Sequence, residues 1–199
     1  MTPVFSVARC LLCLVVFLLP AGAAENPHQK NRVGDFSTAT LDAWAEKSFV
    51  GKTDYTLVEE GTEKVLQAFC DKSASILYRE IDIDLLETPW LNWSWKISST
   101  YGDIDEKNRK GDDYPARIYV VIKTGIFPWN TFALNYVWSS SSAEGTSWKN
   151  PYTGNASMLA VQSGEKEIGQ WVNERRNVLA DIQQYIDKDI SSLSGVAIM

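Results

Sequence analysis

The sequence feature that most constrains the fold is a strict alternation of apolar and polar residues over positions 90–98. The apolar positions in it are Leu91, Trp93, Trp95 and Ile97, and the polar positions between them are Asn92, Ser94 and Lys96. Successive side chains of a β-strand point to opposite faces of the sheet. This pattern therefore predicts an antiparallel strand that buries one face and exposes the other.

Two further segments repeat this period of two. Inward-facing apolar side chains are expected at Ile118, Val120 and Ile122 in one segment, and at Phe132, Leu134, Tyr136 and Trp138 in the next. Additional strands are expected at 55–60, 65–69, 74–83, 158–161 and 196–199, the first two joined as a hairpin at Gly61-Thr62. Many short strands with turns between them predict a mainly β chain folded as an antiparallel, jelly-roll-like β-sandwich.

One helix is predicted, in the C-terminal half of the chain at residues 177–187. Its apolar residues recur at helical spacing, and Asn177 is placed to cap its first turn. Two long loops, 99–116 and 139–156, remain between the strands. Loops of this length in a compact domain tend to carry function or to be disordered.

The N-terminal residues have the pattern of an export signal. Arg9 precedes an apolar run at 10–19, and the small residues Ala21-Gly22-Ala23 follow it. We expect a cleaved signal peptide at 1–23, a polar arm at 24–34 and a single domain at 35–199. The apolar run is too short to span a bilayer. The mature chain is therefore expected in the periplasm or the medium, without a membrane span.

The chain ends on an apolar strand, residues 195–199, with no polar tail behind it. We expect the β-sandwich to be incomplete at its last strands.

The charge balance excludes some classes of partner. With 19 basic and 25 acidic residues the net charge is −6, whereas nucleic-acid binders carry basic patches. The only histidine is His28, so no histidine-based triad or zinc site is expected, and no cofactor or metal is expected either. After signal cleavage only Cys70 remains, and its apolar neighbours predict a buried thiol.

Six residues are candidates for ligand binding: Asp112, Asp113, Arg117, Tyr119, Trp138 and Arg175. An aromatic ring can pack against the C–H face of a sugar, which gives Trp138 and Tyr119 their candidate role. The carboxylates and arginines could bind sugar hydroxyls, or they could form structural ion pairs that hold loops in place. Trp138 could equally be a core residue.

A catalytic alternative uses acidic residues. Glycoside hydrolysis needs only two carboxylates, and Asp112 or Asp113 could act with Glu174. No catalytic residue is assigned on this basis.

Several short motifs occur in a recognisable order. They are WSWK at 93–96, GDDYPARIYV at 111–120, YVW at 136–138, WVNERRN at 171–177 and GVAIM at 195–199. This order resembles the bacterial secreted family called "domain of unknown function 3047", over about residues 35–199. The resemblance implies a bacterial, extracytoplasmic protein without an assigned activity. Its pattern is similar to the galactose-binding-like jelly rolls of carbohydrate-binding modules, which is an analogy of fold.

Three functions follow as hypotheses. The first is a non-catalytic module that binds a glycan or another envelope component. The second is a carbohydrate-active enzyme with paired carboxylates. The third is a structural domain that binds a protein partner.

Overall fold

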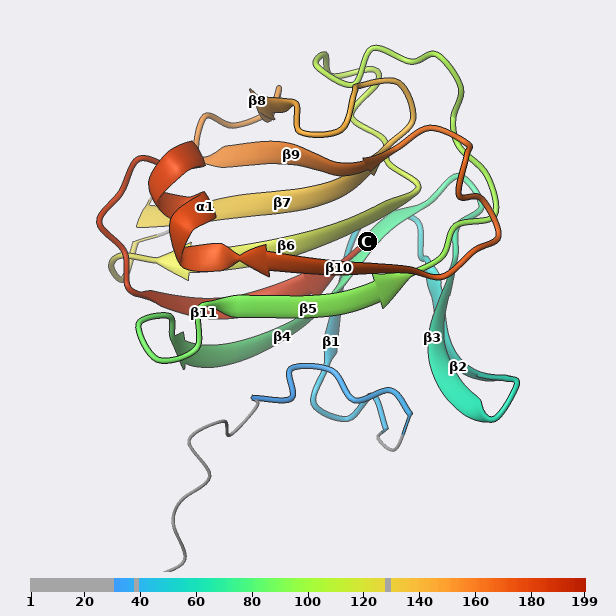
Figure 1. Ribbon diagram of the computed structural model, residues 1–199, viewed down its shortest axis with the longest axis horizontal. Helices are drawn as coiled ribbons and strands as arrows, with labels where there is room; N and C mark the ends of the chain where they lie inside the picture. Colours follow the sequence, from blue (N-terminus) through green and yellow to red (C-terminus); the bar gives the residue numbers. More distant parts are fainter. Residues whose placement is uncertain (1–30, 38–39, 128–129) are drawn as a thin grey trace, which may run out of the picture.

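A computed structural model describes residues 31–37, 40–127 and 130–199 of the chain. The predicted signal peptide (1–23) and most of the predicted arm (24–34) lie outside the described residues. The described chain is mainly β with one helix (Figure 1). The prediction of a mainly β, sandwich-like fold with a C-terminal helix is confirmed.

One large mixed sheet forms the centre of the fold, with the strand order β1-β4-β11-β6-β7-β9-β8. Its strands are β1 (Ala45–Val50), β4 (Ala74–Asp84), β11 (Ser192–Ile198), β6 (Ala116–Lys123), β7 (Thr131–Ser139), β9 (Ala156–Ser163) and β8 (Ser147–Lys149). The last strand of the chain, β11, is thus placed in the interior of the sheet, between β4 and β6.

A second layer covers one face of this sheet (Figure 1). It consists of a two-stranded antiparallel ribbon, β5 (Trp90–Trp95) with β10 (Val172–Asn177), and of helix α1 (Val178–Tyr185). The predicted capping residue Asn177 accepts a hydrogen bond from the backbone N of Ala180 at 3.1 Å, which fixes where the helix begins. Because α1 follows β10 directly, the cap also holds the helix against the end of the ribbon.

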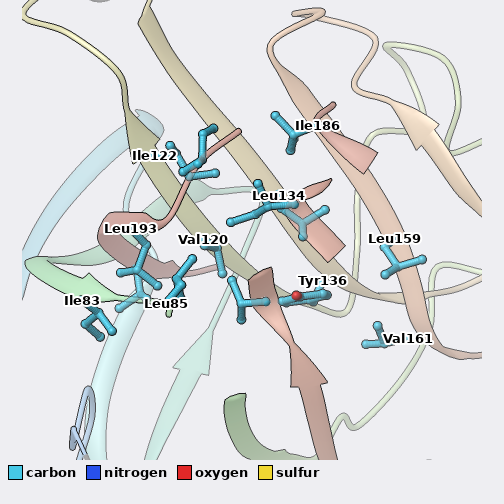
Figure 2. Packing of buried hydrophobic residues seen from close by; sticks show 14 of the residues in the cluster. Ile83, Leu85, Val120, Ile122, Leu134, Tyr136, Leu159, Val161, Ile186 and Leu193 are labelled. Atoms are coloured by element: carbon cyan, nitrogen blue, oxygen red, sulfur yellow. The ribbon is translucent and has the colours of Figure 1, made fainter. Parts of the chain in front are cut away.

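The main hydrophobic core lies between these two layers. Figure 2 shows side chains from several strands and from beyond the helix meeting there, among them Val120, Leu134 and Ile186. The inward residues predicted for β7 all belong to this core or pack against it. The predicted faces of β5 and β6 are confirmed in the same way, with Trp95, Val120 and Ile122 each 7% exposed or less.

The opposite face of the large sheet is also covered. A smaller apolar cluster of Tyr114, Val137, Met158 and Ala160 lies there, and Trp148 packs against it. Tyr114 comes from the long loop after β5, and Trp148 comes from β8. Both predicted long loops therefore contribute to the packing of this second face.

The hairpin of β2 (Asp54–Glu60) and β3 (Glu63–Phe69) forms as predicted and turns at Gly61, whose φ of +65° suits glycine.

Three expectations need correction. The predicted sandwich is antiparallel throughout, but strands β7 and β9 pair in parallel. Strand β8 lies on the outer side of β9 and returns the chain to the start of β9, so that β9 runs in the same direction as β7. Strands β1, β8 and β10 lack clear alternation and were not predicted. Cys70 is exposed at the end of the hairpin, beyond the reach of the core.

Candidate functional site

Two predicted ligand-binding residues, Arg117 and Tyr119, lie on the face of the large sheet opposite the helix. Arg117 is only 8% exposed, and its guanidinium stacks on the ring of Tyr119, 4.5 Å from the ring centre. Its Nε donates to Oδ1 of Asn135 at 3.3 Å. The hydroxyl of Tyr119 donates to Sδ of Met199 at 3.0 Å. Both side chains are therefore committed to contacts inside the protein.

Asp112 joins this buried group from the long loop. Its Oδ2 lies 3.7 Å from Nη1 of Arg117, and both side chains are 9% exposed. The amide of Asn150 donates to both carboxylate oxygens, at 3.2 and 3.0 Å, and the hydroxyl of Tyr114 donates at 3.0 Å. Burial, reinforced by the Asp112 charge, raises the pKa of Tyr114, so this phenol keeps its proton. These contacts make Asp112 and Arg117 a clamp that holds two loops on the sheet.

Trp138 does not reach the surface. It is 0% exposed, packs 5.8 Å from the ring centre of Trp95, and donates from Nε1 to the carbonyl of Gly164 at 3.0 Å. The interpretation of Trp138 as a stacking surface for sugar is therefore wrong. Both faces of β7 are covered in the folded chain, and Trp138 is a core residue.

The large sheet separates two carboxylates of the catalytic alternative, Asp112 and Glu174. Asp112 lies with Arg117 on one face, and Asp113 beside it is exposed. Glu174 belongs to β10, in the layer that covers the other face. Burial raises the pKa of Glu174, and the nearby charge of Glu144 adds to this shift. The pairing of Asp112 with Glu174 across one groove is thus contradicted.

Glu106 joins the two long loops through hydrogen bonds to its carboxylate. It is 1% exposed, and its carboxylate accepts from Oγ of Ser139 at 2.5 Å and from backbone N of Ser140 at 2.6 Å. A shallow hollow between these loops is lined by Asp103, Asp105 and two serines, Ser141 and Ser142, among others, and is open to solvent. Because the buried carboxylate is fully engaged, Glu106 acts as an internal link between the loops.

The sixth predicted residue, Arg175, lies on a different surface, the outer face of the β5–β10 ribbon. This face turns away from the core, in front of the large sheet in Figure 1. Its exposed side chains are Trp90, Asn92, Ser94 and Lys96 along β5, and Trp171, Asn173 and Arg175 along β10. We call this set of residues the ribbon face.

Each end of the ribbon face carries an exposed tryptophan with a cation stacked on it. At one end Trp90 is 49% exposed, and the guanidinium of Arg175 lies 4.3 Å from its ring centre. At the other end Trp171 is 43% exposed, and Nζ of Lys96 lies 5.2 Å from its ring centre. Six residues of extended chain separate Trp90 from Lys96, which is about 20 Å.

Polar side chains fill the space between the two tryptophans. Ser94 donates from Oγ to Oδ1 of Asn173 at 2.6 Å across the strands, and Asn92 lies opposite Arg175. At the Trp171 end, the carboxylate of Glu60 from the β2–β3 hairpin accepts a hydrogen bond from the ammonium of Lys96. The same carboxylate accepts a second hydrogen bond from Nε1 of Trp171 at 3.2 Å. The hydrogen bond from Lys96 lowers the pKa of Glu60, which keeps this carboxylate charged.

The inner face of the same ribbon is firmly anchored. Trp93 stacks on Tyr136 with ring centres 5.3 Å apart and meets Trp95 edge-on at 5.5 Å. Arg176 on β10 forms an ion pair with Asp181 of the helix. The outer face is therefore presented on a rigid support, as a binding surface requires.

Sequence reasoning missed Trp90 and Trp171. The signal was available for Trp90, because it occupies the same phase of the alternation as Asn92 and Ser94. A tryptophan on the polar side of a strand is expected to be exposed. For Trp171 no such signal existed, because the sequence does not reveal that its segment pairs with β5.

The described residues offer neither a membrane-spanning helix nor a cluster of metal ligands. None of their helices is long and apolar enough to cross a membrane. Nor does that part of the chain bring together three or more His, Cys, Asp or Glu side chains able to hold a metal ion.

Comparison with known proteins identifies a family for this chain. No curated protein matches the sequence. The model of one family matches residues 42–199, which includes every strand of the fold described above. The chain belongs to this family, which is described as "Protein of unknown function (DUF3047)".

Proposed function

We propose that this protein is a non-catalytic module that binds a glycan or another polysaccharide of the cell envelope, and that the ribbon face is its binding surface. The observation that carries the proposal is the pair of exposed tryptophans, Trp90 and Trp171, at opposite ends of the polar ribbon face. The sugar-binding role predicted for Trp138 thus passes to two residues that solvent can reach.

The chemistry of the ribbon face suits a carbohydrate. The C–H face of a pyranose packs on an aromatic ring, and its hydroxyls need donors and acceptors at the side. The amides of Asn92 and Asn173 and the hydroxyl of Ser94 supply both kinds of group between the tryptophans. The two paired strands of the ribbon run side by side between the tryptophans and would suit an extended chain that lies along them.

The rigidity of the ribbon also supports binding. Its inner face is held by stacked aromatics and by the Arg176–Asp181 ion pair. A preformed surface loses little conformational entropy on binding, so a modest contact area can give a micromolar to millimolar affinity. The catalytic alternative has weaker support, because Asp112 is held in a buried ion pair with Arg117 and Glu174 belongs to the layer on the other face of the large sheet.

Export to the periplasm or the medium belongs to this proposal. It rests on the signal pattern at 1–23, and it would bring the ribbon face into contact with envelope polysaccharides.

The test is glycan binding by the mature chain and its variants. Residues 24–199 would be screened on an array of soluble oligosaccharides and by co-sedimentation with peptidoglycan. Trp90→Ala and Trp171→Ala should each weaken binding of the best ligand about tenfold, because each removes one stacking contact. Near-ultraviolet circular dichroism would verify that both variants are folded.

Tyr152→Ala is the matched control. Tyr152 is 60% exposed and also carries a stacked arginine, Arg109, at 5.3 Å, but it lies on a loop over the other face of the sheet. Its loss should leave binding unchanged. The proposal fails if the folded protein binds no glycan, or if the double variant Trp90→Ala/Trp171→Ala binds as well as the original. Either result would favour the protein-partner hypothesis.

A further inference from the structure

The two ends of the ribbon face differ in charge. At the Trp171 end, the ammonium of Lys96 is paired with the carboxylate of Glu60. At the Trp90 end, Arg175 makes no ion pair with any of the described residues. The face therefore has one compensated cation and one uncompensated cation.

The surroundings of Arg175 are neutral. Its strand neighbours on the same face are Asn173 and Asn177, and Asn92 is its partner on β5. The guanidinium carbon lies over the exposed ring of Trp90, 4.3 Å from the ring centre, and the guanidinium donates a hydrogen bond to none of the described residues, so its N–H groups are available to a ligand. In a chain with a net charge of −6, an arginine exposed among amides is a local positive spot on an acidic protein.

We infer that the polysaccharide bound by the ribbon face is anionic, and that its acidic group binds Arg175 at the Trp90 end. This inference rests on the proposed function. The guanidinium edge presents parallel N–H donors that match the two oxygens of a carboxylate or a phosphate group. The ring of Trp90 beside it receives the C–H face of the same sugar unit.

The opposite end sets the direction of the chain. Glu60 keeps its charge next to Trp171 and would repel a second acidic group there, while its carboxylate can accept from sugar hydroxyls. A neutral sugar unit is therefore expected on Trp171. The ligand is a chain in which an acidic unit on Trp90 is followed, about 20 Å away, by an uncharged unit.

The experiment compares three forms of one oligosaccharide: a uronate form, the same chain with its carboxyls reduced to alcohols, and a form phosphorylated at that position. At low salt the uronate form should bind about fivefold more tightly than the reduced form, the range of an exposed ion pair. The preference should disappear in Arg175→Gln and in high salt, and should persist in part in Arg175→Lys. A stronger response to the phosphorylated form would support the same anionic site and identify a sugar phosphate as its ligand.

Arg109→Gln is the control, because Arg109 also stacks on an exposed aromatic ring but lies on the loop side of the molecule. It should leave the preference intact. Equal binding of the three forms, with Trp90→Ala still weakening all of them, would overturn this inference and leave the proposed function standing. If Trp90→Ala and Trp171→Ala change nothing, the proposed function fails and the inference fails with it.

Discussion

Arg176 and Asp181 form a bidentate ion pair that joins the C-terminal end of strand β10 to the first turn of the helix. Nε of Arg176 donates to one carboxylate oxygen at 2.9 Å, and Nη2 donates to the other at 2.6 Å. The hydroxyl of Tyr136 donates to the same carboxylate at 2.8 Å, from the central strand β7. One aspartate thus holds the ribbon, the helix and the large sheet together.

Replacement of this aspartate should destabilise the protein. Asp181→Asn removes the charge of a buried carboxylate but keeps its shape, and leaves the partly exposed Arg176 without its counter-charge. We expect a loss of about 2–3 kcal/mol in the free energy of unfolding, below the full cost of breaking a buried pair because Arg176 is partly exposed. Urea denaturation would measure it. Asp189→Asn, at an exposed position shortly after the helix, should change stability by less than about 0.5 kcal/mol.

The environment of Glu174 predicts a pH-dependent gain from its substitution. Burial raises the pKa of Glu174, so the folded protein disfavours its charged form. Ionised Glu174 then costs stability at pH values above the raised pKa, and this cost disappears as the pH falls through that pKa. Glu174→Gln should therefore be more stable than the original at about pH 8, by less than about 1 kcal/mol because the side chain is partly exposed and water screens its charge.

Thermal unfolding measured from about pH 4 to pH 8 would check this, with the two curves converging at the acidic end. Glu87→Gln, at an exposed position, is the control and should show no such convergence. A Glu174→Gln variant that is less stable at every pH would contradict the prediction.

The clamp at Arg117 should matter for stability and not for ligand binding. Asp112→Asn leaves a buried guanidinium without its counter-charge, so we expect a loss of about 2–3 kcal/mol. Glycan affinity should stay unchanged at temperatures where the variant is folded. Asp113→Asn, at the exposed neighbouring position, should alter neither property. Weaker binding by a folded Asp112→Asn variant would return this residue to the ligand site.

Two tryptophans should respond in opposite ways to the same substitution. Trp138→Phe loses buried volume and the hydrogen bond to Gly164, which predicts a loss of about 2 kcal/mol in the free energy of unfolding. Trp90→Phe, at a position that is 49% exposed, should change stability by less than about 0.5 kcal/mol and weaken glycan binding instead. Denaturation and binding assays on both variants would separate core from surface.

Much of the fold could be predicted because its strongest signals are local. The alternation in β5, β6 and β7 identified these strands and their inward faces, and Asn177 marked the start of the helix. The hairpin of β2 and β3 was predicted from its turn. Each of these features depends on residues within one or two turns or strands of one another.

The candidate site was harder to predict, because it depends on contacts between distant segments. The sequence indicates Arg175 as a candidate ligand-binding residue because it is a polar residue beside a strand. Only the pairing of β10 with β5 places its guanidinium over the ring of Trp90. The sequence leaves Trp138 open as a sugar-stacking or a core residue, because it does not show that both faces of β7 are covered. Asp112 and Glu174 were grouped although a sheet separates them.

The amino-acid sequence by itself determined the strands, the phase of their side chains, the helix cap and the acidic charge of the chain. These follow from the backbone geometry of short segments and from counting residues. The tertiary structure alone decided which faces meet. Residues 90 and 177 become neighbours only when β5 and β10 pair. Burial of the inner ribbon face on the large sheet then leaves Trp90, Arg175 and Trp171 on the outside, because successive side chains of a strand point to opposite faces of the sheet.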